Sequence, residues 1–262
     1  MRTLTCVMAL ALLAAPALAD WDPIDGTKMH YPQFPDPEGW DVRATYYTAL
    51  ADDFMCMETG PITDFHIWTS YKGDQIVDMA DIEFIHTAIY TDVPATTETW
   101  SMPGELRWHH DWMLDPPIGP LPTMRPAGTG TQGWYDPLAG LVLQEDHHEF
   151  QQWNFFIDDP ADAFEQQEGE IYWLEMSFKL TAAAIEDGKR IGWKTSGSQQ
   201  WNDDAVYREV VEGQEPEWLE LTDPIYPQES LDLAFVITPE PASLMLLATG
   251  AGALLMRRRR RR

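Results

Sequence analysis

The sequence predicts an all-β protein, an antiparallel β-sandwich of jelly-roll type. Apolar and polar side chains alternate with a period of two in several short segments, which is typical of strands with one face on a core. Stretches rich in Pro and Gly separate these segments. Few helix-forming stretches lie between them, so crossover helices that join parallel strands are not expected. Many short strands without such helices favour antiparallel sheets packed face to face.

The clearest strand signal is the segment 62–71. Its side chains Phe65 and Ile67 would lie on one face of a strand, while the polar residues between them would lie on the other. The segment 81–91 repeats this alternation and ends in a proline turn at Pro94. Further strands are expected at 106–113, 150–157, 171–180, 191–195, 205–208 and 231–238.

Three stretches between these strands have a different composition. Residues 159–168 are expected to form one or two helical turns. Residues 180–187 contain three consecutive alanines and end before Gly188, which is typical of a short helix. Residues 115–136 are rich in Pro and Gly and are expected to separate two strands. The last strand runs into Pro239, which cannot donate to a sheet, so the domain is expected to end at residue 238.

The chain is strongly acidic. It has 262 residues and a formal net charge of −26 at pH 7. Between residues 20 and 238 it carries ten basic and 42 acidic residues. Such a surface repels the phosphates of nucleic acids and of anionic lipids, so neither is expected as a partner. It suits divalent cations or cationic partners, and it would equally serve to keep a secreted protein soluble.

The first 19 residues have the pattern of a secretory signal peptide. Arg2 precedes an apolar stretch at 4–13, and Ala17-Leu18-Ala19 has the small-x-small pattern of a cleavage site. The mature chain is therefore expected to begin near Asp20 and to lie outside the inner membrane. No linker interrupts residues 20–238, so they are expected to form a single ectodomain.

The chain ends in an apolar segment, residues 242–256, followed by six arginines. As a helix with a rise of about 1.5 Å per residue, the segment would span roughly 22 Å, less than the roughly 30 Å of a bilayer core. We expect it to cross the inner membrane as a transmembrane helix with help from its flanks, with the arginines on the cytoplasmic side. An ordinary C-terminal anchor would show the same pattern.

Pro239-Glu240-Pro241 stands directly before this segment, and Arg257 and Arg258 directly follow it. This order of parts resembles the PEP-CTERM sorting signal of bacteria that make exopolysaccharide, and it covers residues 239–262. The resemblance implies that an exosortase-like enzyme processes the chain near the Pro-Glu-Pro motif. It also implies an exported protein that is held in the inner membrane as a precursor and then reaches the cell surface or extracellular matrix.

Several short segments of the ectodomain are also familiar. They resemble an uncharacterised extracellular domain of planctomycete-type secreted proteins that carry the same tail. The segments that carry this resemblance are 50–54, 62–68, 89–94, 132–137, 192–196, 201–205 and 231–237. The resemblance implies a fold and a habitat but no chemistry.

All twelve tryptophans lie between the two terminal segments. Exposed aromatic faces bind carbohydrate because the apolar faces of sugar rings stack on them, whereas a sandwich core also uses large aromatic side chains. Four tryptophans lie within strand patterns and are expected in the core: Trp68, Trp153, Trp173 and Trp193. The candidates for exposed, sugar-binding residues are Trp134 and Tyr135, in a loop flanked by Gly and Pro, and Trp108 and Trp112.

Adjacent acidic residues indicate a candidate structural Ca²⁺ site. Ca²⁺ takes six to eight oxygen ligands, commonly from Asp, Asn and backbone carbonyls of loops. Asn202, Asp203 and Asp204 would supply part of such a shell, as would the pair at 158–159. Neither group has the spacing of an EF-hand loop. Paired aspartates such as those at 52–53 or 203–204 would alternatively cap a turn. No other cofactor is expected.

Two histidine doublets, at 109–110 and 147–148, lie beside carboxylates. One imidazole from each would complete a transition-metal site if both doublets lay on strands of one sheet. No His-x-His or His-Glu-x-x-His spacing supports this reading, and surface imidazoles in acidic loops are commoner. Cys56 is the only cysteine after the signal peptide, and we expect it to be a buried hydrophobic residue.

No catalytic motif is present in the sequence. It contains no Gly-x-Ser-x-Gly elbow, no P-loop and no dinucleotide fingerprint. With 42 acidic residues, some pair will lie at a glycosidase spacing by chance. We therefore expect a non-enzymatic surface or matrix component with a structural or adhesive role in exopolysaccharide. The alternatives are a carbohydrate-binding module and, behind it, a glycan-active hydrolase.

Overall fold

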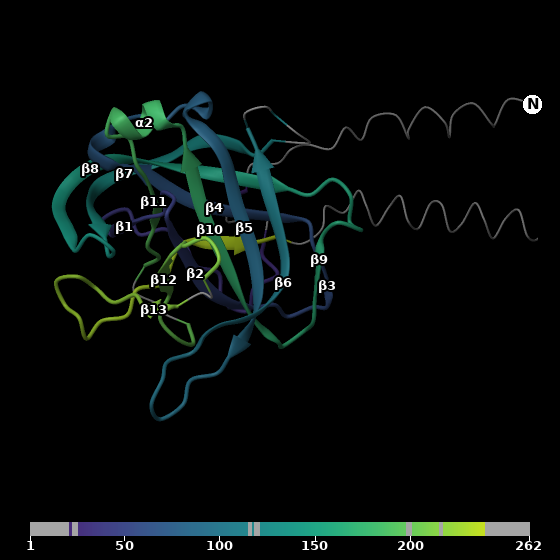
Figure 1. Cartoon of the computed structure of the whole chain (residues 1–262). Helices are drawn as coiled ribbons and strands as arrows, with labels where there is room; N and C mark the ends of the chain where they lie inside the picture. The colour runs from purple at the N-terminus through teal and green to yellow at the C-terminus, as the bar shows by residue number, and fades with distance from the viewer. Residues whose placement is uncertain are drawn as a thin grey trace, which may run out of the picture. The chain divides into compact units, whose positions relative to one another are not determined.

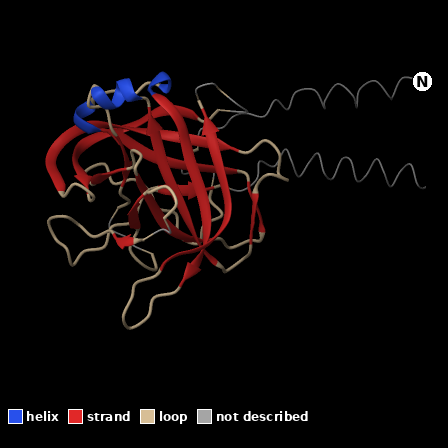
Figure 2. Cartoon of the chain, viewed as in Figure 1, coloured by secondary structure: helices blue, strands red, loops and turns tan. Residues whose placement is uncertain are grey.

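The computed structural model describes residues 21–22, 26–114, 117, 121–197, 201–214 and 217–238. The expected signal peptide, residues 1–19, and the expected sorting segment, residues 239–262, lie outside these residues. In the described ranges, no helix has both the length and the apolar character needed to cross a membrane. Residues 27–238 form one compact unit, called the body below. It consists mainly of strands (Figures 1 and 2).

Two six-stranded sheets make up most of the body. In order across the first sheet the strands are β11 (Ile191–Lys194), β1 (Trp40–Arg43), β7 (Thr123–Asp136), β8 (Leu141–Phe156), β4 (Asp64–Tyr71) and β14 (Phe235–Ile237). In order across the second they are β13 (Leu219–Glu220), β12 (Val206–Glu209), β2 (Thr48–Met55), β10 (Ile171–Leu180), β5 (Ile82–Val93) and β6 (Met102–Met113).

The remaining elements are short. Strands β3 (Gly60–Ile62) and β9 (Phe164–Gln166) pair with each other, and α2 (Ala182–Glu186) is a single helical turn capped by Thr181. Two 3₁₀ turns, η1 (Lys72–Asp74) and η2 (Met79–Asp81), lie between β4 and β5. The strands named here pair antiparallel, except that β1 and β7 run parallel. The predicted all-β class is therefore confirmed.

Five strands of the first sheet form a closed ring. Strand β11 pairs with β1 on one side and with β4 on the other, so the order β1, β7, β8, β4, β11 returns to β1. Strand β14 pairs with the other half of β4, beside residues 65–67. A closed ring leaves no free edge among its five strands and encloses the side chains that point inward.

The hydrophobic core lies between the two sheets. Ring centroids of Trp153 and Phe178 lie 5.6 Å apart, and those of Phe54 and Phe235 lie 6.0 Å apart, each pair joining one sheet to the other. The four tryptophans predicted for the core are all buried, as is Cys56, so these predictions are confirmed: Trp68, Trp153, Trp173 and Trp193.

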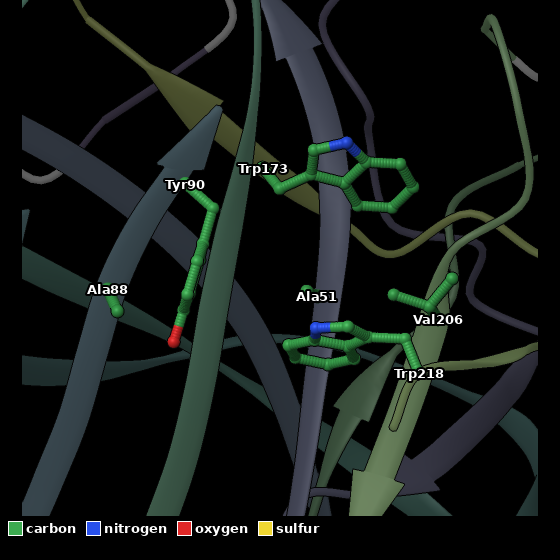
Figure 3. Close-up of a cluster of buried hydrophobic side chains, with 6 residues drawn as sticks. All are labelled: Ala51, Ala88, Tyr90, Trp173, Val206 and Trp218. Atoms are coloured by element: carbon green, nitrogen blue, oxygen red, sulfur yellow. The ribbon is translucent and has the colours of Figure 1, made fainter. Parts of the chain in front are cut away.

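The outer face of the second sheet carries a separate buried cluster (Figure 3). Its members are Ala51, Ala88, Tyr90, Trp173, Val206 and Trp218, and Trp100 and Met102 pack against it. In this view Ala51 lies between the indoles of Trp173 and Trp218. The small alanines leave room for these aromatic side chains, so this face of the sheet is covered by the protein's own residues.

The structure confirms most predicted strands and corrects two predictions about the stretches between them. Strand β10 has the predicted bounds, and α2 lies within the predicted helix at 180–187. The prediction that 115–136 only separates strands is wrong, because most of it forms β7. The prediction of one or two turns at 159–168 holds only for residues 159–163, which form turns with hydrogen bonds to the third residue along the chain, and it is wrong for residues 164–166, which form β9.

Candidate cation-binding site

An acidic cavity of about 790 Å³ opens on the surface of the body. Its walls come from the chain near residues 36–40, 195–197 and 222–232, together with two residues of the second sheet and the turn before it. Of the described residues that line it, seven are acidic and none is basic: Asp36, Glu38, Asp204, Glu220, Asp223, Glu229 and Asp232. A concave site lined by charges of one sign concentrates counter-ions, so this cavity attracts cations.

Three carboxylates at the edge of this cavity converge, and we call them the carboxylate cluster. Asp203, Asp204 and Glu220 are half-buried, and one oxygen from each lies within 4.8 Å of the others. Asp203 and Asp204 lie in the turn that leads into β12, and Glu220 lies in β13, which pairs with β12. Carboxylate oxygens are the ligands that hard divalent cations prefer.

The position of Asp203 is fixed by hydrogen bonds. Its Oδ2 accepts from the backbone N–H and the hydroxyl of Ser101, each at 2.7 Å, and its Oδ1 accepts from the N–H of Asp204 at 3.0 Å. Ser101 immediately precedes β6. The carboxylate cluster thereby joins the loop before β6 to the turn before β12. Asn202, directly before it, has a positive φ of 63°, and asparagine tolerates this conformation better than most residues.

The carboxyl groups of this region repel one another. Burial raises the pKa of Glu220, and the Asp204 carboxyl, which is within hydrogen-bonding reach, raises it further. A cation bound between these carboxyl groups would relieve their repulsion.

Asp53 lies behind the carboxylate cluster, in the middle of β2. Its side chain is fully buried. Its Oδ2 accepts from the amide of Asn202, whereas its Oδ1 has no hydrogen-bond partner among the described residues. Burial raises the pKa of Asp53 to about 8; the Asn202 bond opposes this, and the negative charges of Asp232, Asp92 and Asp203 add to it. An unpaired buried carboxylate is costly, so this residue also calls for a proton or a cation.

Asp52 and Asp232 extend the acidic group on the other side of β2. Asp52 accepts from the N–H of Leu233 at 2.5 Å and from Gln33 at 3.1 Å. Burial and the nearby charge of Asp232 raise the pKa of Asp52 well above its usual value. Asp232 lines the acidic cavity, and burial raises its pKa to about 7. The expectation that the pair at 52–53 caps a turn is wrong, because both residues lie within β2.

A second polar centre fills the closed ring. Each of its five strands contributes one fully buried polar or charged side chain: Asp41, Ser70, Gln132, His147 and Lys194. The Lys194 ammonium donates to Asp41 at 3.1 Å and to Gln132 at 2.5 Å, and His147 Nε2 lies 2.9 Å from Asp41. Burial alone would raise the pKa of Asp41, but Lys194 and His147 hold it below its ordinary value. This network is therefore self-neutralising.

The same network has the connectivity of a hydrolytic triad. Ser70 Oγ lies 2.7 Å from His147 Nε2, and Asp146 Oδ2 lies 3.1 Å from His147 Nδ1. However, Asp41 shares the same Nε2 atom, and both Ser70 and His147 are fully buried inside the ring. In the described conformation this serine is closed off from solvent, and the network pairs the buried Asp41 carboxylate with Lys194 and His147.

The structure corrects half of the predicted sugar-binding surface. Trp134 and Trp112 were expected to be exposed, and both are 1% exposed. Trp134 lies in β7 inside the ring, with its indole 6.3 Å from the His147 imidazole. Trp112 lies in β6 and donates to Thr87 Oγ1 at 3.1 Å. Buried indoles cannot stack on a sugar, so the exposure expected for these two residues was wrong.

The other two aromatic candidates are half-buried. Trp108 donates its indole N–H to the carbonyl of Asp162 at 2.7 Å, and its ring lies nearly parallel to His110 at 6.1 Å. Tyr135 lies in β7, next to the buried Trp134. The structure does not bring these candidates together, since Trp108 is in the second sheet and Tyr135 in the first.

The predicted metal ligands are partly brought together. Asp203 and Asp204 converge as expected, but the amide of Asn202 turns to Asp53 instead. Sequence reasoning missed Glu220. No spacing in the sequence indicates it, because the pairing of β13 with β12 brings it to the site. The sequence does contain a signal for Asp53, because two adjacent aspartates interrupt the apolar run of β2. The histidine doublets lie in different sheets, and no histidine joins a metal-like cluster within the described residues.

Residues 29–238 match a family described as a domain of unknown function (DUF7901). The chain belongs to this family. No curated protein and no solved structure matches the chain. The matched residues contain the acidic cavity, the carboxylate cluster and the closed ring, so all three are features of the DUF7901 domain of this chain.

Proposed function

We propose that this chain is exported and that its DUF7901 domain is a non-enzymatic component of the cell surface or extracellular matrix, with a structural or adhesive role in exopolysaccharide. The leader-like start and the Pro-Glu-Pro tail support export and processing by an exosortase-like enzyme. Two mainly antiparallel sheets that share a core support a sandwich of jelly-roll type.

The acidic cavity carries the adhesive part of this proposal. Its seven acidic and no basic lining residues repel an anionic polymer and attract cations. A divalent cation held there keeps coordination positions open toward solvent, and carboxylate or hydroxyl groups of a polysaccharide are suitable ligands for them. The domain therefore binds acidic exopolysaccharide through divalent cations rather than through direct contact of like charges.

Co-sedimentation with an acidic polysaccharide tests this function. The purified protein is mixed with polygalacturonate coupled covalently to agarose beads, and with uncharged cellulose as the control polymer. We expect retention on polygalacturonate with calcium chloride and release by EDTA, and weaker retention of the cavity variant Glu229→Gln combined with Asp36→Asn. Equal retention on cellulose, or retention that survives EDTA, would contradict the proposal. Release of reducing ends from either polymer would assign the cavity to a glycan-active hydrolase instead.

A carbohydrate-binding module is the second candidate, and the half-exposed Trp108 favours it. Its ring lies nearly parallel to that of His110 at 6.1 Å, on the same face of β6 as the buried Trp112, and its half-exposed part offers an aromatic surface. A glycan array in the presence of EDTA separates this candidate from the first. Saturable binding of a neutral glycan that is lost in Trp108→Ala would establish it, while no neutral binding would leave the cation-dependent role.

A further inference from the structure

We propose that Asp203, Asp204 and Glu220 bind one divalent cation, with Ca²⁺ the ion that fits, and that this ion fastens β13 and two loops to the second sheet. This proposal identifies the ligand of the acidic cavity. It rests on the proposed function only for the biological role of the bound ion.

The spacing of the three carboxylates fits a single ion. Ca²⁺ binds oxygen at about 2.3–2.6 Å, so two ligands of the same ion lie at most about 5 Å apart. One oxygen from each member of the carboxylate cluster lies within 4.8 Å of the others. Mg²⁺, with oxygen distances near 2.1 Å, requires ligands that are closer together and more regularly placed. The cavity beside Asp204 and Glu220 leaves room for water or a second ligand.

Asp53 supplies an independent sign of a cation. Its side chain is fully buried, and in the described part of the chain one of its oxygens finds no hydrogen-bond partner. Its other oxygen accepts from Asn202, the residue before Asp203, so the carboxyl faces the carboxylate cluster. A positive ion there would offset the charge of Asp53 as well as the charges of its direct ligands.

Two other fully buried carboxylates, Asp41 and Glu175, have a basic partner, whereas Asp52 has none among the described residues. Asp41 pairs with Lys194 at 3.1 Å, and Glu175 pairs with Arg208 at 2.7 Å. By contrast, no Lys, Arg or His in the described part of the chain forms an ion pair with Asp53, Asp232 or any member of the carboxylate cluster. The protein thus leaves one group of carboxylates unpaired, and that group borders the acidic cavity.

The ion would connect elements that are otherwise weakly held. Strand β13 has two residues and pairs only with β12. Trp218, which packs on the outer-face cluster, lies two residues before Glu220 (Figure 3). Removal of the ion leaves the carboxylates repelling one another, so β13 and Trp218 are expected to loosen together.

Titration with the metal alone tests the proposal. The purified protein is stripped with EDTA, dialysed, and titrated with calcium chloride by calorimetry, with no polysaccharide present. We expect one saturable site, a higher melting temperature, and a change in tryptophan fluorescence as Trp218 becomes buried. Glu220→Gln should weaken binding by roughly 10- to 100-fold. The matched control Glu209→Gln, an exposed residue of β12 outside the cavity and the cluster, should bind as the wild type does.

The outcomes separate this proposal from the proposed function. Absence of saturable calcium binding by the wild type, or unchanged affinity in Glu220→Gln, would overturn the ion site. Tighter binding of magnesium than of calcium would overturn the choice of ion. Calcium binding without retention on polygalacturonate would contradict the adhesive function and leave the site standing. Because Glu220 lies on an edge strand, Glu220→Gln tests the site without removing the Ser101 bonds that hold Asp203.

Discussion

Asp41 and Asp53 are both fully buried, yet their side chains have opposite surroundings. Asp41 lies inside the closed ring, where the Lys194 ammonium and the His147 imidazole contact it. Asp53 receives only the neutral amide of Asn202. A buried charge is tolerated where it is paired, so the first environment is complete in the protein alone and the second is completed by a proton or an ion.

Removal of Lys194 should destabilise the protein strongly. Lys194→Met leaves Asp41 buried without its main counter-charge, and breaking a buried ion pair costs about 3–5 kcal/mol. Urea unfolding followed by tryptophan fluorescence measures the loss. The double variant Lys194→Met with Asp41→Asn should recover part of it. Lys189→Met, which removes the surface pair with Asp81, is the control and should have a much smaller effect. Equal losses for Lys194→Met and Lys189→Met would contradict the argument.

His147 should make stability depend on pH. Burial lowers its pKa, but hydrogen bonds and charge attraction from Asp41 and Asp146 outweigh burial, and the pKa is raised above the ordinary value. Lys194 also faces Asp41 and opposes protonation at close range. Because the folded-state pKa lies above the unfolded value of about 6.5, the stabilisation is fully present below about pH 6.5 and is lost as pH rises through the folded-state pKa.

Unfolding free energies measured by urea denaturation across this pH range, in buffer with EDTA, check the prediction. The wild type should lose stability with rising pH above about pH 6.5, and His147→Gln should lack that part of the slope. His148→Gln replaces an exposed neighbour and should keep the slope of the wild type. Parallel curves for the wild type and His147→Gln would show that the imidazole is neutral in the folded protein.

Single-residue burial was only partly predictable from the sequence. Trp153, Trp173 and Trp193 lie in apolar strand patterns, and their burial followed from those patterns. Trp134 lies between Gly and Pro, which indicate a loop, yet it packs inside the ring. Ring closure depends on the pairing of β11 with β4, two strands that are far apart in the chain. Local composition does not indicate that pairing.

At the scale of elements, β7 shows where local rules fail. Its Pro126 and Gly128 flank one register shift, and further shifts lie between Thr129 and Gln132 and between Gln132 and Trp134. Such irregularities let a strand contain residues that a regular ladder excludes.

Strand β4 shows a second limit of prediction from local sequence. It alternates as predicted, but seven of its eight residues are buried, because its polar side chains face the interior of the ring or other covered surfaces.

Gly130 in β7 should not tolerate a side chain. A Cβ there would overlap the backbone carbonyl of Pro37, which crosses close to this part of the strand. Gly130→Ala forces one of the two backbones to move, at a cost of about 1–3 kcal/mol as in other overpacked sites. Thermal melts compare it with Gly197→Ala, where no atom lies within 4 Å of the added Cβ and φ is not positive. A melting temperature unchanged in both variants would contradict the close approach.

At the scale of the whole molecule, the two ends of the body lie side by side. The N–H of Lys28 donates to the carbonyl of Ile237 at 2.8 Å, and the Thr27 hydroxyl donates to the same oxygen at 2.9 Å. The family match begins at residue 29 and ends at residue 238, so it covers the body and stops before the Pro-Glu-Pro motif. The recognisable domain and the expected sorting segment are therefore separate parts of the sequence.

The sorting segment should decide where the domain is found. If residues 239–262 anchor a precursor that is later processed, deletion of these residues should release the domain into the medium, because the signal peptide alone directs export. Intact-mass measurement of protein from cells and from medium locates both ends. We expect the wild-type mature chain to begin near Asp20 and to be shortened near Pro239.

Replacement of Arg257 and Arg258 by glutamine is the milder variant. It should reduce retention in the membrane fraction without altering the body, since cationic residues hold the cytoplasmic flank of an anchor. A full-length, unprocessed chain in the cytosol would contradict both the export and the surface role that depends on it.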